Sequence, residues 1–359
     1  MPEQMYAIRL DAPNDLKYVR VEKPVPAMYE VLCRIESVSI CGTDPHIING
    51  DFPGFWPQSF PLIPGHEWAG VVVELGEKAE NFGWKIGDRV CGIANLGCGH
   101  CKNCMEGRFT ICLNYGKQAV HKMYGHITQG AYAQYMAVNI RSIAKIPDDM
   151  NFDIAACMDP LSIALHVVMH SRIEPGDSVL VMGAGAQGLM SILCARSMGA
   201  GFILCAGSGG RLREAERLGA IPIDYKTENV VERVMQLTGG LGAKRIMECS
   251  GTAEGVRNAC FSAARGGVIS AVGFPKEDVP IPVKRLVLDE IEFVGNRANP
   301  NTLEKAITIA YRYREELQRF ITDTYPLSQY QEAFKKFTGR QEGTLKIVLK
   351  PQQQTGGAI

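Results

Sequence analysis

The sequence predicts an α/β protein with two domains, one rich in β-strands and one built on a doubly wound parallel sheet. Up to about residue 150, short β-like runs alternate with turns that contain Gly and Pro. From Ser178 onward, apolar strands alternate with helical segments, which is typical of a parallel sheet covered by helices. A glycine-rich turn at residues 183–188 joins a predicted strand to a predicted helix. The length of 359 residues also favours two domains, at roughly 150 residues per domain.

The elements follow one another in an order that suggests a domain inserted into another. The predicted strands of the first region are 31–40, 68–75, 89–93 and 131–138. Those of the second region are 178–182, 202–206, 221–224, 245–249 and 268–272, with helices beginning at 186, at 211 and near 230, and one at 255–264. A strand at 291–294, helices at 303–313 and 329–337 and a strand at 345–349 complete the chain. We therefore predict a β-rich domain of residues 1–160 and 297–359, interrupted by a nucleotide-binding domain of residues 161–296.

Charge and composition exclude several classes of protein. The 38 Lys and Arg residues balance 38 Asp and Glu residues, whereas binding to nucleic acid or to an anionic membrane needs a basic excess. No apolar stretch approaches the ~20 residues of a membrane-spanning helix, and the first residues show no secretory signal. We therefore expect a cytoplasmic protein without nucleic-acid or membrane partners. In a reducing compartment its 12 cysteines indicate metal binding rather than disulfides.

Four of these cysteines fall within fifteen positions, at Cys98, Cys101, Cys104 and Cys112. Gaps of two residues allow successive thiolates to converge on one ion, and the longer gap closes a tetrahedron. A shell of four thiolates has no open position, so the spacing predicts a structural zinc site. An iron–sulfur cluster and four separately buried cysteines are the alternatives.

A second group of metal-binding side chains lies earlier in the chain. Cys41, Asp44 and His46 follow one β-like run, and His66 and Glu67 begin another. A thiolate, an imidazole and a carboxylate or water suit an open, catalytic zinc. Each residue alone is more typical of core packing, but together they favour a metal site.

The glycine-rich turn predicts a dinucleotide site. Gly183, Gly185 and Gly188 form a G-x-G-x-x-G motif after the strand 178–182 and before a helix. In this context the glycines allow a tight turn, close backbone approach to a pyrophosphate and helix packing against the sheet. The phosphates would lie at the helix N-terminus, which favours anions.

The end of the next strand favours NADP over NAD. About twenty residues after the glycines, an Asp or Glu usually binds the ribose 2′-hydroxyl, but residues 206–211 read Ala-Gly-Ser-Gly-Gly-Arg. Without that carboxylate a 2′-phosphate is not repelled, and Ser208, the glycine amides and Arg211 offer donors and charge. In the alternative interpretation Arg211 only begins a helix.

Six segments together resemble the zinc-dependent medium-chain dehydrogenases, and within them most closely the polyol (sorbitol-type) and threonine dehydrogenases. The segments are 41–46, 65–70, 87–90, 98–112, 159–162 and 183–188. The resemblance runs from about residue 5 to 350. It implies a GroES-like catalytic domain and a Rossmann cofactor domain.

The resemblance also implies roles for the metal-binding residues. Cys41, His66 and Glu67 would bind the catalytic zinc, and Asp44 would orient the ligating histidine. Asp159 would be a fourth ligand or a partner through water, although polyol members usually carry the longer Glu there. Cys157, two positions earlier, is a rival for that place.

A reaction and further contacts follow from the same resemblance. Thr43 would accept the alcohol proton and pass it through the cofactor ribose towards His46, whose imidazole exchanges protons near neutral pH. The remaining cofactor-binding positions would be Gln187, Ser250, Val272, Phe274, Asn296 and Arg297.

We therefore expect an NAD(P)-dependent enzyme that interconverts a secondary alcohol, of the polyol or sugar-alcohol class, and its ketone. A threonine 3-dehydrogenase-like activity is the alternative enzyme, with Arg297 as a candidate carboxylate clamp. A dinucleotide-binding structural or sensor protein without catalysis is the alternative of another class. Relatives are commonly dimers or tetramers, so a homo-oligomer is expected.

Overall fold

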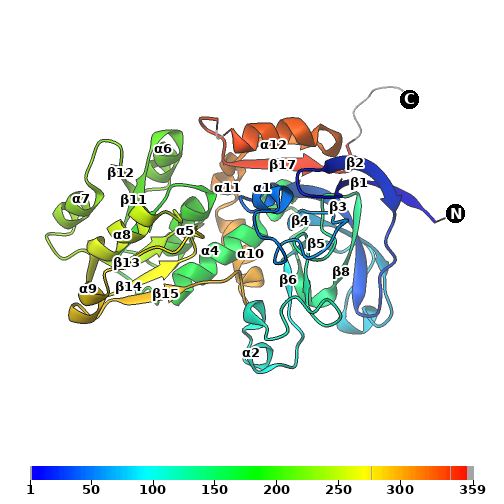
Figure 1. Cartoon of the computed structure of the whole chain (residues 1–359), viewed down its shortest axis with the longest axis horizontal. Helices are drawn as coiled ribbons and strands as arrows, with labels where there is room; N and C mark the ends of the chain where they lie inside the picture. Colours follow the sequence, from blue (N-terminus) through cyan, green and yellow to red (C-terminus); the bar gives the residue numbers. More distant parts are fainter. Residues whose placement is uncertain (1, 276, 340, 354–359) are drawn as a thin grey trace. The chain divides into compact units, whose positions relative to one another are not determined.

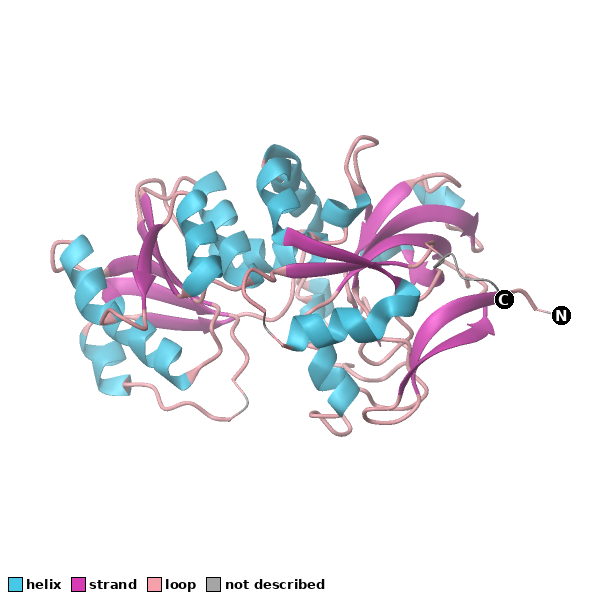
Figure 2. Ribbon diagram, turned by 90° about the horizontal axis from the view of Figure 1, so that it is seen from above, coloured by secondary structure: helices cyan, strands magenta, loops and turns pink. Residues whose placement is uncertain are grey.

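The computed structural model describes residues 2–275, 277–339 and 341–353 and divides into two compact units (Figure 1). Unit 1 consists of Met1–Asp159 and Leu303–Ile359, and unit 2 of Pro160–Thr302. The predicted fold class is confirmed: an α/β protein in which a β-rich unit accompanies a doubly wound parallel sheet (Figure 2). None of the helices in the described ranges is both long and apolar enough to cross a membrane.

Unit 1 is built on a mixed sheet in which β3 (Glu30–Ser39) is central. The sheet order is β16-β17-β3-β4-β5-β9, and β8 also pairs with β3. The other strands of this sheet are β4 (Glu67–Leu75), β5 (Arg89–Gly92), β8 (Tyr135–Asn139), β9 (Ile143–Lys145), β16 (Ile321–Pro326) and β17 (Lys346–Lys350). Smaller pairs are formed by β1 (Gln4–Leu10) with β2 (Leu16–Glu22), and by β6 (Asn95–Leu96) with β7 (Lys122–Met123).

The helices of unit 1 are short, and along the sequence most of them connect its strands. They are α1 (Asp44–Asn49), α2 (Lys102–Met105), α3 (Phe152–Ala155), α10 (Leu303–Arg312), α11 (Arg314–Phe320) and α12 (Tyr330–Thr338). The apolar core includes Trp68 and Tyr132, which are 1% and 0% exposed. A side chain at Gly92 would come within 2.5 Å of the Trp68 ring, so only glycine fits there.

Unit 2 contains a six-stranded sheet in the order β12-β11-β10-β13-β14-β15, and every neighbouring pair is parallel. The strands are β10 (Ser178–Met182), β11 (Phe202–Gly207), β12 (Ile221–Asp224), β13 (Ala243–Glu248), β14 (Ala263–Ala271) and β15 (Glu292–Gly295). The helices are α5 (Ala186–Ser197), α6 (Gly209–Arg217), α7 (Val230–Leu237), α8 (Ala253–Ser262) and α9 (Val283–Leu288); α4 (Met158–His170) begins in unit 1 and continues into unit 2. In such a sheet the loops that follow the strands form the ligand-binding edge.

Candidate active site and metal centres

Two neighbouring strands of unit 1 bring Cys41, His66 and Glu67 together. Ser39 at the end of β3 pairs with Glu67 at the start of β4, so the residues just beyond this pair meet. The three ligand atoms, one from each side chain, all lie within 4.8 Å of one another, and His66 and Glu67 are buried. The sequence placed these residues at strand ends, and the structure gathers them into one group.

The Asp44 carboxylate supports this group from the first turn of α1. Its Oδ2 accepts hydrogen bonds from the Cys41 backbone N–H at 2.8 Å and the Tyr132 hydroxyl at 2.5 Å. Its Oδ1 lies 3.6 Å from His66 Nδ1. Burial raises the pKa of Asp44. The carboxylate therefore fixes the Cys41 backbone and places a negative charge behind the His66 ring.

The chemistry of the group fits a bound cation. Burial alone would lower the pKa of His66, but the neighbouring Cys41, Asp44 and Asp159 raise it to about 10. A buried site that holds a proton this firmly carries an excess of negative potential. A thiolate, an imidazole and a carboxylate are also the donor types that catalytic zinc sites use.

Glu67 has a second set of partners that the sequence did not indicate. Lys346 in β17 donates from Nζ to Glu67 Oε2 and, at 2.9 Å, to the carbonyl oxygen of Ile40; Ser39 also donates to Oε2. The side chains of Glu67 and Lys346 are 2% and 3% exposed. Burial would raise the pKa of Glu67, but the charges of Lys346 and His66 and the hydrogen bonds from Lys346 and Ser39 together lower it. Glu67 is therefore a buried anion with one oxygen engaged by protein donors.

Asp159 and Cys157 lie outside the compact ligand group. Asp159 is buried, and its Oδ1 accepts a hydrogen bond from Ala94 N–H at 3.3 Å. Cys157 is also buried; its thiol donates to the Asp153 carbonyl at 3.6 Å, and burial raises its pKa to about 12. Of the two rivals, Asp159 is the one whose charge acts on His66.

Thr43 and His46 lie on the chain that follows Cys41. The Thr43 hydroxyl donates to Cys41 Sγ at 3.3 Å, which places it beside the ligand group. His46, in α1, lies with Nδ1 at hydrogen-bonding distance, 2.6 Å, from a carboxylate oxygen of Asp51.

Aromatic rings extend from His66 towards the four-cysteine lobe. The ring of His126, which the sequence did not single out, lies with its centroid 4.3 Å from that of His66 and 4.9 Å from that of Trp56. Trp56 Nε1–H donates to the Tyr115 hydroxyl at 2.5 Å. Tyr115 follows the last cysteine of the lobe by three residues, so the lobe supports the aromatic side of the ligand group.

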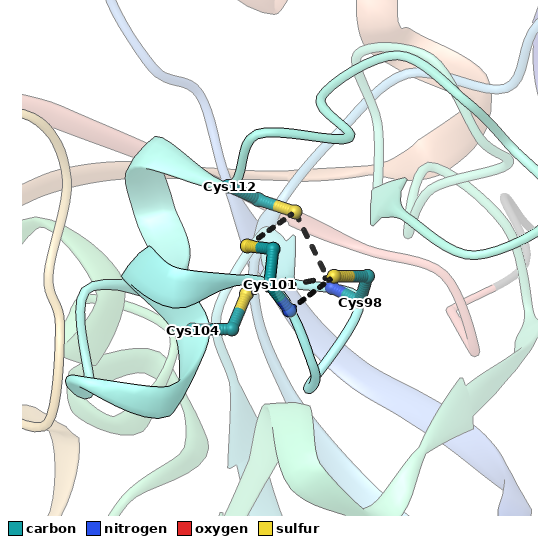
Figure 3. Close-up of side chains that lie close together, drawn as sticks. All are labelled: Cys98, Cys101, Cys104 and Cys112. Carbon is teal, nitrogen blue, oxygen red and sulfur yellow. Dashed lines mark hydrogen bonds between the residues drawn. The ribbon is translucent and has the colours of Figure 1, made fainter.

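The four lobe cysteines direct their sulfurs toward one another (Figure 3). The Cys98–Cys104 and Cys101–Cys112 sulfur pairs are 4.0 and 3.9 Å apart. These distances are close to the roughly 3.8 Å expected between thiolates on one tetrahedral ion with bonds of about 2.3 Å. All twelve cysteines of the chain are free.

Backbone and side-chain N–H groups surround these sulfurs. Cys98 Sγ accepts from the Asn114 side chain and from Cys101 N–H, both at 3.4 Å. The Asn114 hydrogen bond, with those of the backbone, lowers the pKa of Cys98 to about 5. At Cys98 these hydrogen bonds favour the thiolate, the form that binds metal, whereas burial raises the pKa of Cys104 to about 12 and also that of Cys112.

We expect Cys101→Ala to lower the unfolding temperature of the metal-bound protein by roughly 10 °C. This corresponds to a loss of about 3 kcal/mol in the free energy of unfolding, since each kcal/mol shifts the unfolding temperature of a protein of this size by about 2–4 °C. One metal ion per chain should be lost, because the lobe then has three thiolates. His100→Ala, an exposed position inside the same lobe, is the matched control and should change neither property. Calorimetry and metal analysis test this, and an unchanged transition in Cys101→Ala would contradict a structural metal.

In unit 2 the glycine motif forms the turn from β10 into α5. Gly183 has φ +101°, and a side chain at Gly188 would come within 1.8 Å of the Gly183 carbonyl oxygen. Gly185 is the N-cap of α5, and a side chain there would meet open space. Two glycines are thus required by the turn, and the third leaves a backbone surface open to a pyrophosphate. Gln187 is the second residue of α5.

The other predicted cofactor residues follow β13, β14 and β15. Glu248, which the sequence did not single out, is fully buried and accepts hydrogen bonds from Ser250 N–H at 2.9 Å and from the Ser250 hydroxyl. Val272 N–H donates to the Glu248 carbonyl at 2.9 Å, and Phe274 is 67% exposed. Asn296 Nδ2 donates to Ser270 Oγ at 2.9 Å, and Arg297 comes next. The Glu248 carboxylate therefore holds the loop that follows β13, and its backbone carbonyl holds the loop that follows β14.

The predicted 2′-phosphate side lies at the start of α6. Ser208 is the N-cap of this helix, and Arg211 is its third residue. The Ser208 hydroxyl donates to the hydroxyl of Tyr225, which follows β12, at 3.1 Å. Tyr225 is half exposed and adds a donor that the sequence did not reveal.

Comparison with known proteins identifies relatives over the whole chain. Residues 27–148 match the alcohol dehydrogenase GroES-like domain, and residues 186–311 match the zinc-binding dehydrogenase family. Sorbitol dehydrogenase of Bacillus subtilis (strain 168) is 28% identical over 98% of this chain and 99% of its own length. An L-threonine 3-dehydrogenase of Shewanella pealeana is 30% identical over 92% of this chain and 95% of its own length. Among solved structures, a putative zinc-binding dehydrogenase from Sinorhizobium meliloti 1021 bound to NADP has 28% sequence identity and a TM-score of 0.89. The match covers 97% of this chain and 100% of that one.

Proposed function

Because this chain belongs to the zinc-dependent medium-chain dehydrogenase family, we propose that it interconverts a secondary alcohol of the polyol or sugar-alcohol class and its ketone. Hydride transfer would use NADP or NAD. The observation that carries the proposal is the group of half-buried Cys41 with buried His66 and Glu67, which has the Thr43 hydroxyl beside it.

Cys41, His66 and Glu67 hold the catalytic zinc in this proposal, and Asp159 acts on it directly or through water. Zinc bound there would supply a Lewis acid that lowers the pKa of the substrate hydroxyl. Thr43 Oγ1 would accept the proton of that hydroxyl while its own hydroxyl proton is passed on towards His46, and His46 would release a proton to water. The buried aromatic surface around His126 excludes water from the reacting end of the substrate.

We propose NADP as the preferred cofactor. Gly185 and the N-terminus of α5 would bind the pyrophosphate, and Ser208, Tyr225 and Arg211 would lie around the 2′-phosphate. Support comes from residues 206–211, which offer hydroxyl, amide and guanidinium donors and no carboxylate. The loops after β13, β14 and β15 hold the nicotinamide end.

The test is a panel of polyols, secondary alcohols and L-threonine, each assayed with NADP and with NAD. We expect polyols to be oxidised and kcat/KM to be higher with NADP. A preference for L-threonine would support the threonine 3-dehydrogenase-like alternative instead. Binding of dinucleotide with no turnover of any alcohol would favour a non-catalytic role.

We expect Ser208→Asp to lower kcat/KM with NADP roughly tenfold to a hundredfold while NAD is used at least as well. An added carboxylate repels a 2′-phosphate but accepts hydrogen bonds from a 2′-hydroxyl. Ser208→Ala is the matched control, because it removes the hydroxyl without adding charge. An equal loss with both cofactors in Ser208→Asp would contradict this placement of the phosphate.

We also propose that the chain assembles as a dimer or tetramer through unit 2. Helix α9 exposes Val283, Val287 and Leu288 at 58%, 70% and 70%, and β15 is an edge strand. Exposed apolar side chains beside an open strand edge favour burial against a second copy. Light scattering of the purified protein measures its oligomeric state.

A further inference from the structure

His46 lies at the end of a short helix whose cap turns the chain back on it. Helix α1 ends at Asn49, and Gly50 adopts φ +73° in the left-handed region. After this turn the Asp51 N–H donates to the His46 carbonyl at 2.9 Å. The Asp51 carboxylate thereby comes within 2.6 Å of His46 Nδ1. The helix cap and the His46–Asp51 hydrogen bond are thus one local structure.

The partner on Nδ1 determines which nitrogen of His46 can take a proton. A carboxylate can only accept a hydrogen bond, so Nδ1 carries the hydrogen. In the neutral ring Nε2 is then the basic nitrogen. The side chains of His46 and Asp51 are 35% and 34% exposed, so the ring is in contact with both protein and water. Phe52, with its ring centroid 5.8 Å from that of His46, covers part of it.

We propose that Asp51 is a positioning residue for proton release: it holds His46 in the tautomer and orientation in which Nε2 accepts the substrate proton. The proposal rests on the proposed function, in which His46 is the outer proton acceptor. Alcohol oxidation sends a hydride to the dinucleotide and a proton to Nε2, from which water removes it. A base held by a third group is the arrangement that general-base catalysis uses elsewhere.

The first test is a double-mutant cycle on the metal-bound enzyme. We expect Asp51→Asn to lower kcat for alcohol oxidation roughly tenfold to a hundredfold, as for other lost orienting partners. The dissociation constant of the dinucleotide should stay within about twofold of the wild-type value. In a His46→Gln background, Asp51→Asn should have no further effect, because its partner is gone. Asp148→Asn, at an exposed site of unit 1, is the matched control.

The second test reads the tautomer directly and needs no substrate. In protein labelled with 15N-histidine, the His46 resonances, assigned by their loss in His46→Gln, should show the Nδ1–H form. In Asp51→Ala, which removes the acceptor on Nδ1, this form should lose its dominance. A persistent Nδ1–H form, or an Asp51→Asn penalty that remains without His46, would overturn the proposal. If no alcohol is oxidised at all, the proposed function fails while the tautomer still reports on Asp51.

Discussion

Cys41→Ser is expected to reduce kcat/KM for alcohol oxidation by about a thousandfold or more. Cys41 supplies the only thiolate of the compact ligand group, and a serine hydroxyl is a much weaker donor to zinc. A Lewis acid contributes several kcal/mol to such a reaction, and about 4 kcal/mol corresponds to a thousandfold. Metal analysis should show a fall from about two ions per chain to about one, because the four-cysteine lobe is untouched.

The control for this experiment separates metal loss from loss of a thiol. Cys194→Ala removes a fully buried cysteine from α5 and should keep both metal ions. Circular dichroism should show the same secondary structure in both variants. If Cys41→Ser kept two ions per chain, or wild-type turnover, the assignment of the catalytic metal to this group would be wrong.

The parts of the site that could be predicted from the sequence are those encoded over short distances. The lobe spacing at residues 98–112, the glycine motif at 183–188 and the pair His66 and Glu67 each place several functional atoms within a few positions. The alternation of strands and helices from residue 178 onward similarly reflects local burial. For such patterns the local chain geometry already limits where the side chains can go.

The unpredicted parts depend on contacts between distant segments. Lys346 meets Glu67 across 279 positions, and Tyr132 meets Asp44 across 88. Nothing near Lys346 in the sequence distinguishes it from a solvated lysine at a strand end. The strands β1 and β2 were also not predicted, because their mixture of charged and apolar residues gains its meaning only from their antiparallel pairing. Register, which only the folded chain fixes, decides these contacts.

Lys346→Met is the stability change with the largest expected effect, about 3–5 kcal/mol in the free energy of unfolding of unit 1. The variant leaves the Glu67 carboxylate buried without its cation, and breaking such a pair costs this much. All three tryptophans, Trp56, Trp68 and Trp84, lie in unit 1, so urea unfolding followed by tryptophan fluorescence reports on this unit. Metal-bound and chelator-treated samples should be compared.

Two matched variants show whether the cost comes from the unpaired charge. Lys350→Met removes the next lysine of β17, which pairs with Asp153 and is 20% exposed, and it should cost less because water can replace the partner. Glu67→Gln combined with Lys346→Met should recover part of the loss, because neither member of the pair then carries a charge. A loss as large in Lys350→Met would instead indicate a general requirement for lysine in the strand.

The stability loss in Lys346→Met should depend on pH. In the wild type, Lys346, together with His66 and the Ser39 hydrogen bond, outweighs burial and lowers the pKa of Glu67 below its ordinary value of 4.5. The stabilisation from ionised Glu67 is therefore present above about pH 4.5 and is lost as the pH falls through the lowered pKa. In Lys346→Met the buried carboxyl takes up a proton more readily, which removes the unpaired charge. The stability difference between wild type and variant in the chelator-treated protein should thus be largest near neutral pH and shrink in acid, whereas a difference caused by packing alone would not change with pH.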